Sequence, residues 1–426
     1  MGKRWLLLLM LPWALSSPVG ATPSGGAPGP IPDNAPRTLT LYAFEAPPYQ
    51  VLDNVGPPPH AVTGETVDTV RCAAVQAGWQ TRIYLTPQKR ALHALKTHWA
   101  DGYFAIDPSQ ELDDMARRSN PVALEKWYLY SRTAMADLSE SHIGTVAGSN
   151  EQAWLAARRK ASYLTVGSPT QLLALLERGR IDVVLMDERL MAYLQDHAHL
   201  APAALERRFL RYAPLYLYLD KAFVSRHPSF LNTFNRALPD CMGPQLALND
   251  DERARLRTHA RALMADLGQR LNLEAAINDA PYITDMAEIL TQDSQWQALA
   301  PLAPTALATT LLDLPASRAL ADWARQQQPM VTEAMVINDL GALSAISRLT
   351  SDYWQGDEPK FQQLMGPAAR QTALDVYVSP IRYDASTGRF QVTVSGRIVS
   401  PATGQVLGAV ALGLDVEDAL RATTLD

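Results

Sequence analysis

The sequence predicts two consecutive domains: a two-lobed α/β domain, then an α+β domain built from a long helix and an antiparallel sheet. The chain of 426 residues exceeds the size at which a single hydrophobic core stops growing, and 47% hydrophobic with 19% charged residues is typical of ordered globular proteins. Short strands alternate with helices up to about residue 246. After residue 249, a long helical pattern leads into strands separated by turns.

Residues 1–21 have the features of a cleaved export signal. Two basic residues are followed by the apolar run Trp5–Leu15, which is too short to span a bilayer, and by a small-residue cleavage site at residues 19–21. Residues 22–37 are rich in Pro and Gly and are predicted to form a linker. We therefore expect an exported protein; a retained N-terminal anchor is the alternative.

The α/β domain is predicted over residues 38–246 from a rhythm of strands and helices that occurs twice. The first round contains strands at Thr38–Phe44, Gln80–Leu85 and Ala100–Ile106, with helices at Glu65–Ala77 and Gln88–Thr97. The second contains strands at His142–Val146, Tyr163–Val166 and Ile181–Met186, with helices at Asn150–Arg159 and Pro169–Arg178. An extended return segment, Phe209–Val224, and a helix, Pro228–Leu238, complete the domain. Two α/β units and a return segment indicate two lobes with a cleft between them.

The α+β domain is predicted over residues 250–422. A long helical pattern covers Asp250–Ala276, and further helical segments reach Gln328. Strands are then predicted, with Gly-containing turns between them, at Val331–Asn338, Gly341–Ser347, Leu374–Ile381, Arg389–Ser400 and Val406–Asp415.

Cys72 and Cys241 are the two cysteines of the chain. Oxidising compartments favour pairing, and a bridge between two helices of one lobe would close a long loop. We predict a disulfide; two buried free thiols are the alternative.

Several function classes lack support in the sequence. The formal net charge is −6 and no cluster of Lys and Arg is present, which argues against nucleic acid as a partner. No G-x-S-x-G, H-E-x-x-H or phosphate-loop motif is found, and no cysteine and histidine spacing indicates zinc; the pair His197 and His199 is more typical of an exposed helix end. We expect no cofactor and no metal.

The first domain resembles the periplasmic solute-binding proteins of the polar amino-acid family (family 3, type 2 fold). The resemblance covers Thr38 to about Met242 and rests on four segments in family order: Glu45-Ala46-Pro47-Pro48-Tyr49 with Gly64, Gln88–Leu92 with Ala100–Ile106, Ile143–Ser149, and Gly179–Glu188. It implies a periplasmic protein that closes its lobes on a solute. It also implies that Asp187 pairs with an amino group of the ligand.

Six residues are candidates for the ligand cleft. Glu45 and Tyr49 follow the first strand, where an open α/β sheet has its ligand crevice, and Ser149 and Asn150 begin a helix whose free N–H groups attract anions. An ordinary turn and an ordinary helix cap are the alternatives. Asp187 follows a strand, and Arg90 reaches the cleft or snorkels on the surface; the full set is Glu45, Tyr49, Arg90, Ser149, Asn150 and Asp187. The family's carboxylate-binding arginine is missing from residues 107–114, which puts amino-acid specificity in doubt.

The second domain, over about Glu252–Leu420, resembles the single Cache (PDC-type) extracellular sensor domain, most distinctively in Thr350–Glu358. Acids interleaved with large aromatics are expected to line a pocket for a polar or cationic ligand, with cover of the sheet by the aromatics as the alternative. The predicted pocket residues are Asp352, Tyr353, Trp354, Asp357, Tyr377, Arg397 and Asp415.

These observations predict a non-enzymatic binding or sensing protein that relays occupancy to a membrane transporter, sensor kinase or receptor. Domains of the second type often pair through their long helix, so a homodimer is possible by analogy. A dehydratase-like enzyme that uses Glu45 or Asp187 for proton transfer is the first alternative. A structural adaptor without a ligand is the second.

Overall fold

The computed structural model describes residues 37–53, 62–134, 141–158, 164–197, 205–243, 246–300, 302–366, 374–384 and 388–421. The predicted export signal and residues 22–36 of the predicted linker lie outside these ranges. By their contacts, the described residues from Thr38 onward belong to one unit. Within these ranges, no helix is both long and apolar enough to cross a membrane.

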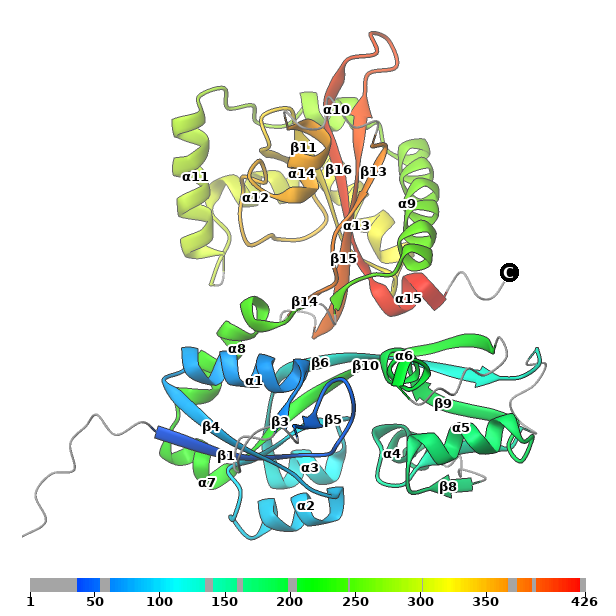
Figure 1. Cartoon of the computed structure of the whole chain (residues 1–426). Helices are drawn as coiled ribbons and strands as arrows, with labels where there is room; N and C mark the ends of the chain where they lie inside the picture. Colours follow the sequence, from blue (N-terminus) through cyan, green and yellow to red (C-terminus); the bar gives the residue numbers. More distant parts are fainter. Residues whose placement is uncertain are drawn as a thin grey trace, which may run out of the picture. The chain divides into compact units, whose positions relative to one another are not determined.

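The first part of the chain is organised around a mixed eight-stranded sheet (Figure 1). The strand order is β4-β1-β5-β10-β6-β9-β7-β8, and β1 with β5, and β7 with both β8 and β9, pair in parallel. The eight strands are β1 (Arg37–Ala43), β4 (Trp79–Leu85), β5 (Gly102–Ile106), β6 (Ala116–Ser131), β7 (Ile143–Val146), β8 (Leu164–Val166), β9 (Val183–Asp187) and β10 (Glu206–Asp220).

Helices follow the strands of this sheet, as expected for parallel β-α-β connections. A two-stranded pair, β2 (Val51–Leu52) and β3 (Val62–Thr63), follows β1. The helices are α1 (Glu65–Gln76), α2 (Gln88–Lys96), α3 (Gln110–Met115), α4 (Asn150–Ala157), α5 (Pro169–Glu177), α6 (Glu188–His197), α7 (Lys221–Arg226) and α8 (Phe230–Cys241).

Two long antiparallel strands, β6 and β10, join the halves of the sheet. The end of β10 pairs with β5 of the first half, and the end of β6 pairs with β9 of the second half. The pairing of β10 with β6 shifts register at three places along its length. The two-lobed α/β arrangement predicted from the sequence is therefore present, with β6 and β10 as the connection between the lobes.

Several predicted boundaries differ from the structure, and two of these differences have a clear cause in helix capping. The extended return segment ends at Asp220 instead of Val224, because the Asp220 side chain accepts a hydrogen bond from the backbone N–H of Ala222 and so caps helix α7. The continuous helical pattern over Asp250–Ala276 is two helices, because Asn272 leaves the helical conformation and caps the second one.

The predicted disulfide is present between Cys72 of α1 and Cys241 of α8, with their Cα atoms 5.7 Å apart. It joins the first and last helices of the α/β part, and the two cysteines are 169 residues apart in the sequence.

The second part of the chain is organised around an antiparallel sheet in the order β12-β11-β16-β15-β13, with β14 paired to β15. Its strands are β11 (Val331–Asn338), β12 (Leu343–Ile346), β13 (Val376–Val378), β14 (Arg382–Asp384), β15 (Arg389–Val399) and β16 (Val406–Asp415). Its helices are α9 (Asp250–Arg270), α10 (Leu273–Asn278), α11 (Met286–Leu299), α12 (Ala306–Asp313), α13 (Pro315–Gln326), α14 (Pro359–Met365) and α15 (Val416–Arg421).

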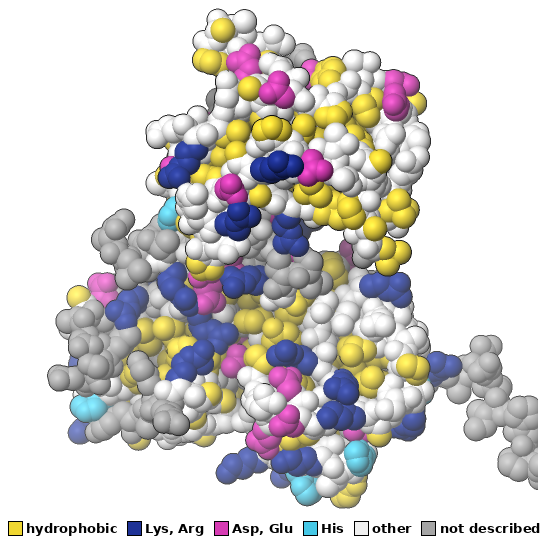
Figure 2. All heavy atoms as spheres, turned by 180° about the vertical axis from the view of Figure 1, so that it is seen from behind, with side chains coloured by type: hydrophobic (Ala, Val, Ile, Leu, Met, Phe, Trp, Pro, Cys, Tyr) yellow, Lys and Arg dark blue, Asp and Glu magenta, His cyan; other side chains and the backbone are white. Residues whose placement is uncertain are grey.

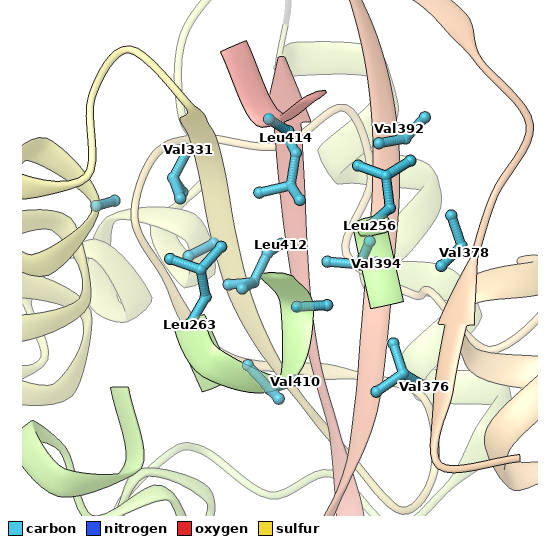
Figure 3. Close-up of a cluster of buried hydrophobic side chains, with 14 of the residues drawn as sticks. Leu256, Leu263, Val331, Val376, Val378, Val392, Val394, Val410, Leu412 and Leu414 are labelled. Carbon is cyan, nitrogen blue, oxygen red and sulfur yellow. The ribbon is translucent and has the colours of Figure 1, made fainter. Parts of the chain in front are cut away.

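Both faces of this sheet are covered, because alternate side chains of its central strands enter two different cores. Leu412 and Leu414 of β16 pack with Leu256 and Leu263 of α9, as the close-up of this cluster shows (Figure 3). Ala409 and Ala411 of the same strand belong to the core on the other face, which also contains residues of α11 and α12.

Candidate functional site

A cavity of about 500 Å³ lies between the two lobes of the α/β part. Such a volume falls within the range of small-molecule sites. The first lobe contributes the loop after β1 and the loop between β4 and α2, and the second contributes the beginnings of α4 and α5, the end of β9 and helix α6. The lining residues include Phe44, Glu45, Tyr49, Leu85, Glu125, Val146, Ser149, Asn150, Glu151, Ser168, Met186, Asp187, Leu190, Tyr193 and Leu194.

Asp187 is held at the end of β9 by four hydrogen bonds. One carboxylate oxygen accepts from the Tyr49 hydroxyl at 2.9 Å and from the backbone N–H groups of Arg189 and Leu190; the other accepts from the backbone N–H of Lys126. Burial raises the pKa of Asp187, and these hydrogen bonds oppose the rise. The carboxylate therefore fixes the start of α6 against both β6 and the first lobe.

Two further carboxyl groups are buried in the same cavity. Glu125 on β6 accepts a hydrogen bond from the indole N–H of Trp127 at 2.7 Å, yet burial, together with the charges of Asp187 and Glu151, raises its pKa well above the usual range. Burial raises the pKa of Glu151 to about 7 against hydrogen bonds from its own backbone N–H and from the Ser149 hydroxyl. The cavity thus gathers three buried carboxyl groups, and none of its described lining residues supplies a cation to pair with them.

The remaining wall is mostly apolar. No Lys, Arg or His side chain is among the described residues that line the cavity. Two cations that adjoin lining residues in the sequence are bound elsewhere: Arg189 pairs with Glu65, and the ammonium group of Lys126 donates to Glu252.

Contacts across the cleft hold the lobes together. Tyr49 of the first lobe donates to Asp187 of the second, and Arg189 of α6 forms a two-bond ion pair with Glu65 of α1. At the other side of the cleft, the Asn150 side chain donates to the carbonyl of Ala105 at 3.0 Å and accepts from the N–H of Asp107 at 3.1 Å. These bonds define a closed arrangement of the lobes.

The structure brings five of the six predicted cleft residues to this cavity: Glu45, Tyr49, Ser149, Asn150 and Asp187. Glu45 is exposed at its mouth, whereas Tyr49 and Asp187 are buried. The side chain of Asn150 forms hydrogen bonds to the backbone of the first lobe. Arg90 is exposed on α2 and is not among the lining residues, because its helix position turns it toward solvent.

The residues predicted to form a pocket in the second domain do not line one cavity. Tyr353 is fully buried and stacks on Trp296, and Trp354 packs against the same core and donates to the carbonyl of Leu340. Asp352 lines a separate depression of about 970 Å³ with Glu333, Arg348, Arg382 and others. Of the remaining four predicted residues, Tyr377 packs against the core, Arg397 donates to the carbonyl of Leu364, Asp415 pairs with Arg389, and Asp357 is exposed.

Glu125 and Glu151 were not predicted from the sequence. Glu125 stands with Lys126 inside the otherwise apolar stretch Val122–Tyr130 of β6, and charges in such a run indicate buried partners. Glu151 sits in the first turn of a helix, where an acid is so common that it gives no functional signal.

The α+β part is bonded to the two strands that connect the lobes. Lys126 of β6 donates to Glu252 of α9 at 2.7 Å and to the carbonyl of Ala247 at 2.9 Å, and the Tyr212 hydroxyl of β10 donates to Glu252 at 3.0 Å. The backbone N–H of Tyr212 also donates to Glu417 of α15. Leu124 and Tyr212 belong to the same hydrophobic core as α9 and β16.

No three His, Cys, Asp or Glu side chains in the described part of the chain are arranged to hold a metal ion. On the face of the molecule shown in Figure 2, side chains of both charge signs are interspersed among the described residues.

We expect the stability of the protein to fall as pH rises from about 4.5 to 7. The pKa of Glu151 is about 7 in the folded protein, so the folded state binds a proton that the unfolded state has already released, and this contribution is lost above pH 7. The penalty at pH 8 is on the order of 3 kcal/mol for this group, and Glu125 and Asp187 act in the same direction. The difference between the free energies of unfolding in urea at pH 5 and at pH 8 measures this loss of stability.

The matched variants are Glu151→Gln and, as control, Glu111→Gln in an exposed ion pair with Lys96. Glu151→Gln is expected to reduce the difference in unfolding free energy between the two pH values, and the control to leave it unchanged. An unchanged difference in Glu151→Gln would contradict the assignment.

No protein-family model and no curated protein matches this chain. The solved structures similar to it include the GluR0 ligand-binding core from Nostoc punctiforme in complex with L-glutamate, at 16% identity over 47% of this chain and 92% of that chain, with a TM-score of 0.38. A histidine kinase sensor domain with similarity to periplasmic binding proteins matches at 19% identity, over 48% and 89% of the two chains, with a TM-score of 0.41. The ancestral amino acid-binding protein AncCDT-1, a precursor of cyclohexadienyl dehydratase, matches at 19% identity, over 48% and 88%, with a TM-score of 0.37. TM-scores below 0.5 are too low to assign a function, so the assignment below starts from the geometry of the cavity.

Proposed function

We propose that the chain is a solute-binding sensor whose lobes close on a small polar molecule and whose closure is passed to the α+β domain. The observation that carries this proposal is the position of β6 and β10. These strands connect the lobes and bond to the second domain, and Glu125 of β6 lines the cavity.

The first step is closure on the ligand. A group in the cavity is surrounded by residues of both lobes, so binding favours the arrangement in which Tyr49 reaches Asp187 and Arg189 reaches Glu65. A solute that contacts both lobes shifts the equilibrium toward the closed form, and one that contacts a single lobe does not.

The second step is transmission through the hinge. Adjacent side chains of β6 point to opposite faces, so Glu125 faces the cavity while Lys126 faces Glu252. The backbone N–H of Lys126 also bonds to Asp187, which moves with the second lobe. A change of the angle between the lobes therefore acts on the start of α9.

Two family assignments follow as proposals. A two-lobed α/β domain over residues 38–246 with this connection supports a periplasmic solute-binding domain. A helix-covered antiparallel sheet over residues 250–422 supports a Cache-like module. A membrane transporter, sensor kinase or receptor would then receive the signal through contact with the second module.

The test is an opened variant, Tyr49→Phe with Arg189→Gln, which removes two of the contacts between the lobes: the Tyr49–Asp187 hydrogen bond and the Arg189–Glu65 ion pair. Small-angle X-ray scattering is expected to show a larger radius of gyration, and hydrogen exchange is expected to rise over residues 247–256, none of which is substituted. Lys96→Ala with Glu111→Ala removes an exposed ion pair within one lobe and is the control. Opened lobes with unchanged exchange over residues 247–256 would contradict the transmission.

An acid–base enzyme is the second candidate, because the pKa of Glu151 is about 7 in an enclosed cavity. Asp187 accepts four hydrogen bonds and Glu45 is exposed, so Glu151 suits proton transfer better than either. Mass spectrometry of a bound solute after long incubation separates a binding protein from an enzyme: a chemically unchanged solute supports the sensor.

A further inference from the structure

We propose that the solute is an organic cation without a carboxylate, such as a linear amine or guanidine with a methylene chain. This inference rests on the proposed function, since it names the class of ligand that closes the lobes.

The charges of the cavity are the first argument. Four acids line it: Glu45 at the mouth, and Glu125, Glu151 and Asp187 in buried positions. No basic side chain is among its described lining residues, and Arg189 and Lys126 are already paired with Glu65 and Glu252. Buried carboxylates without a cation are unfavourable, and a cationic ligand supplies the missing charge.

The helix starts in the cavity are the second argument, because free N–H groups at these positions would otherwise attract a carboxylate. At the start of α4 the protein itself supplies the acceptors: the Ser149 hydroxyl accepts from the N–H of Gln152, and Glu151 lies in the first turn of the helix. At the start of α5 the Ser168 hydroxyl accepts from the N–H of Gln171. A ligand carboxylate beside α4 would lie next to Glu151 and be repelled.

The apolar part of the wall is the third argument. It accommodates a hydrocarbon body, and the aromatic rings of Phe44 and Tyr193 suit contact with a cationic head. This wall comprises Phe44, Leu85, Pro87, Val146, Met186, Leu190, Tyr193 and Leu194.

The discriminating experiment compares amines with the amino acids from which they differ by one carboxylate. Isothermal titration calorimetry of the full mature chain is carried out with agmatine and arginine, cadaverine and lysine, and putrescine and ornithine. Because a like charge about 5 Å away in a partly buried site costs roughly 3 kcal/mol, at least one amine is expected to bind about a hundredfold more tightly than its amino acid.

Glu125→Gln and Glu151→Gln are expected to weaken the binding of that amine at least about tenfold, and the surface variant Glu111→Gln to leave it unchanged. Equal or tighter binding of the amino acid in every pair would overturn the ligand class while leaving the proposed solute-binding function intact. Binding of only uncharged or anionic solutes in a wider panel, such as glucose or glutarate, would do the same. If no compound of any class bound, the proposed function and the ligand class would both fall.

Discussion

Replacement of Lys126 by alanine is expected to lower the free energy of unfolding by about 3–5 kcal/mol, the cost of removing one partner of a buried ion pair. The ammonium group lies 2.7 Å from Glu252, and both side chains are about 5–6% exposed. Without it, the Glu252 carboxylate remains buried with two neutral donors, the Tyr212 hydroxyl and the backbone N–H of Asn249. Urea unfolding at pH 7 measures the loss.

Two further variants show whether the loss comes from the unpaired charge. Lys96→Ala removes an exposed pair and is expected to cost less than about 1 kcal/mol. Lys126→Met combined with Glu252→Gln, which keeps the hydrogen bond to Tyr212, is expected to cost less than the sum of the two single variants. Strict additivity would mean that the two groups do not interact.

Removal of the disulfide by Cys72→Ala with Cys241→Ala is expected to destabilise the protein by about 2–5 kcal/mol, toward the upper end because 169 residues separate the cysteines. The bond limits the conformations of the unfolded chain, and it joins helices that already pack together in the folded state. Thermal unfolding of the double variant measures the effect.

Wild-type protein treated with reductant under native conditions provides the comparison for that variant. Both are expected to unfold at the same lowered temperature and to bind solute unchanged at 25 °C, because the bridge lies outside the cavity lining. A variant as stable as the oxidised protein would contradict the contribution assigned to the bridge.

Most strands and helices were predictable from the sequence, because each carries its own apolar pattern. The sixth strand was not: β6 begins with the polar run Ala116–Asn120 and contains Pro121, which weakens any local strand signal. Its two sequence-distant neighbours, β10 and β9, determine its conformation. Pairing between distant segments leaves little trace in a local pattern.

The residues of the cavity that could be predicted are polar side chains that come directly after a strand. Tyr49 and Asp187 were located in this way, and the structure places them in contact. The aromatic pair Tyr353 and Trp354 shows the limit of such reasoning. Large aromatic residues next to acids are typical of a ligand pocket, but they are equally compatible with a hydrophobic core that has acids at its border. In the structure, Asp293 of α11 accepts from the backbone N–H groups of both residues and holds this segment against the core.

Side chains along β6 alternate between the cavity and the second domain, so the two faces of this one strand are under different evolutionary constraints. Under the proposed function, position 125 can change with the chemistry of the solute, whereas positions 124 and 126 must continue to fit a second domain that contributes none of the described lining residues of the cavity. Specificity can therefore diverge between relatives, or be redesigned, by substitutions on one side of the strand alone. A library that varies residue 125 and the facing wall, with 124 and 126 held constant, would yield receptors for new solutes that keep the same output.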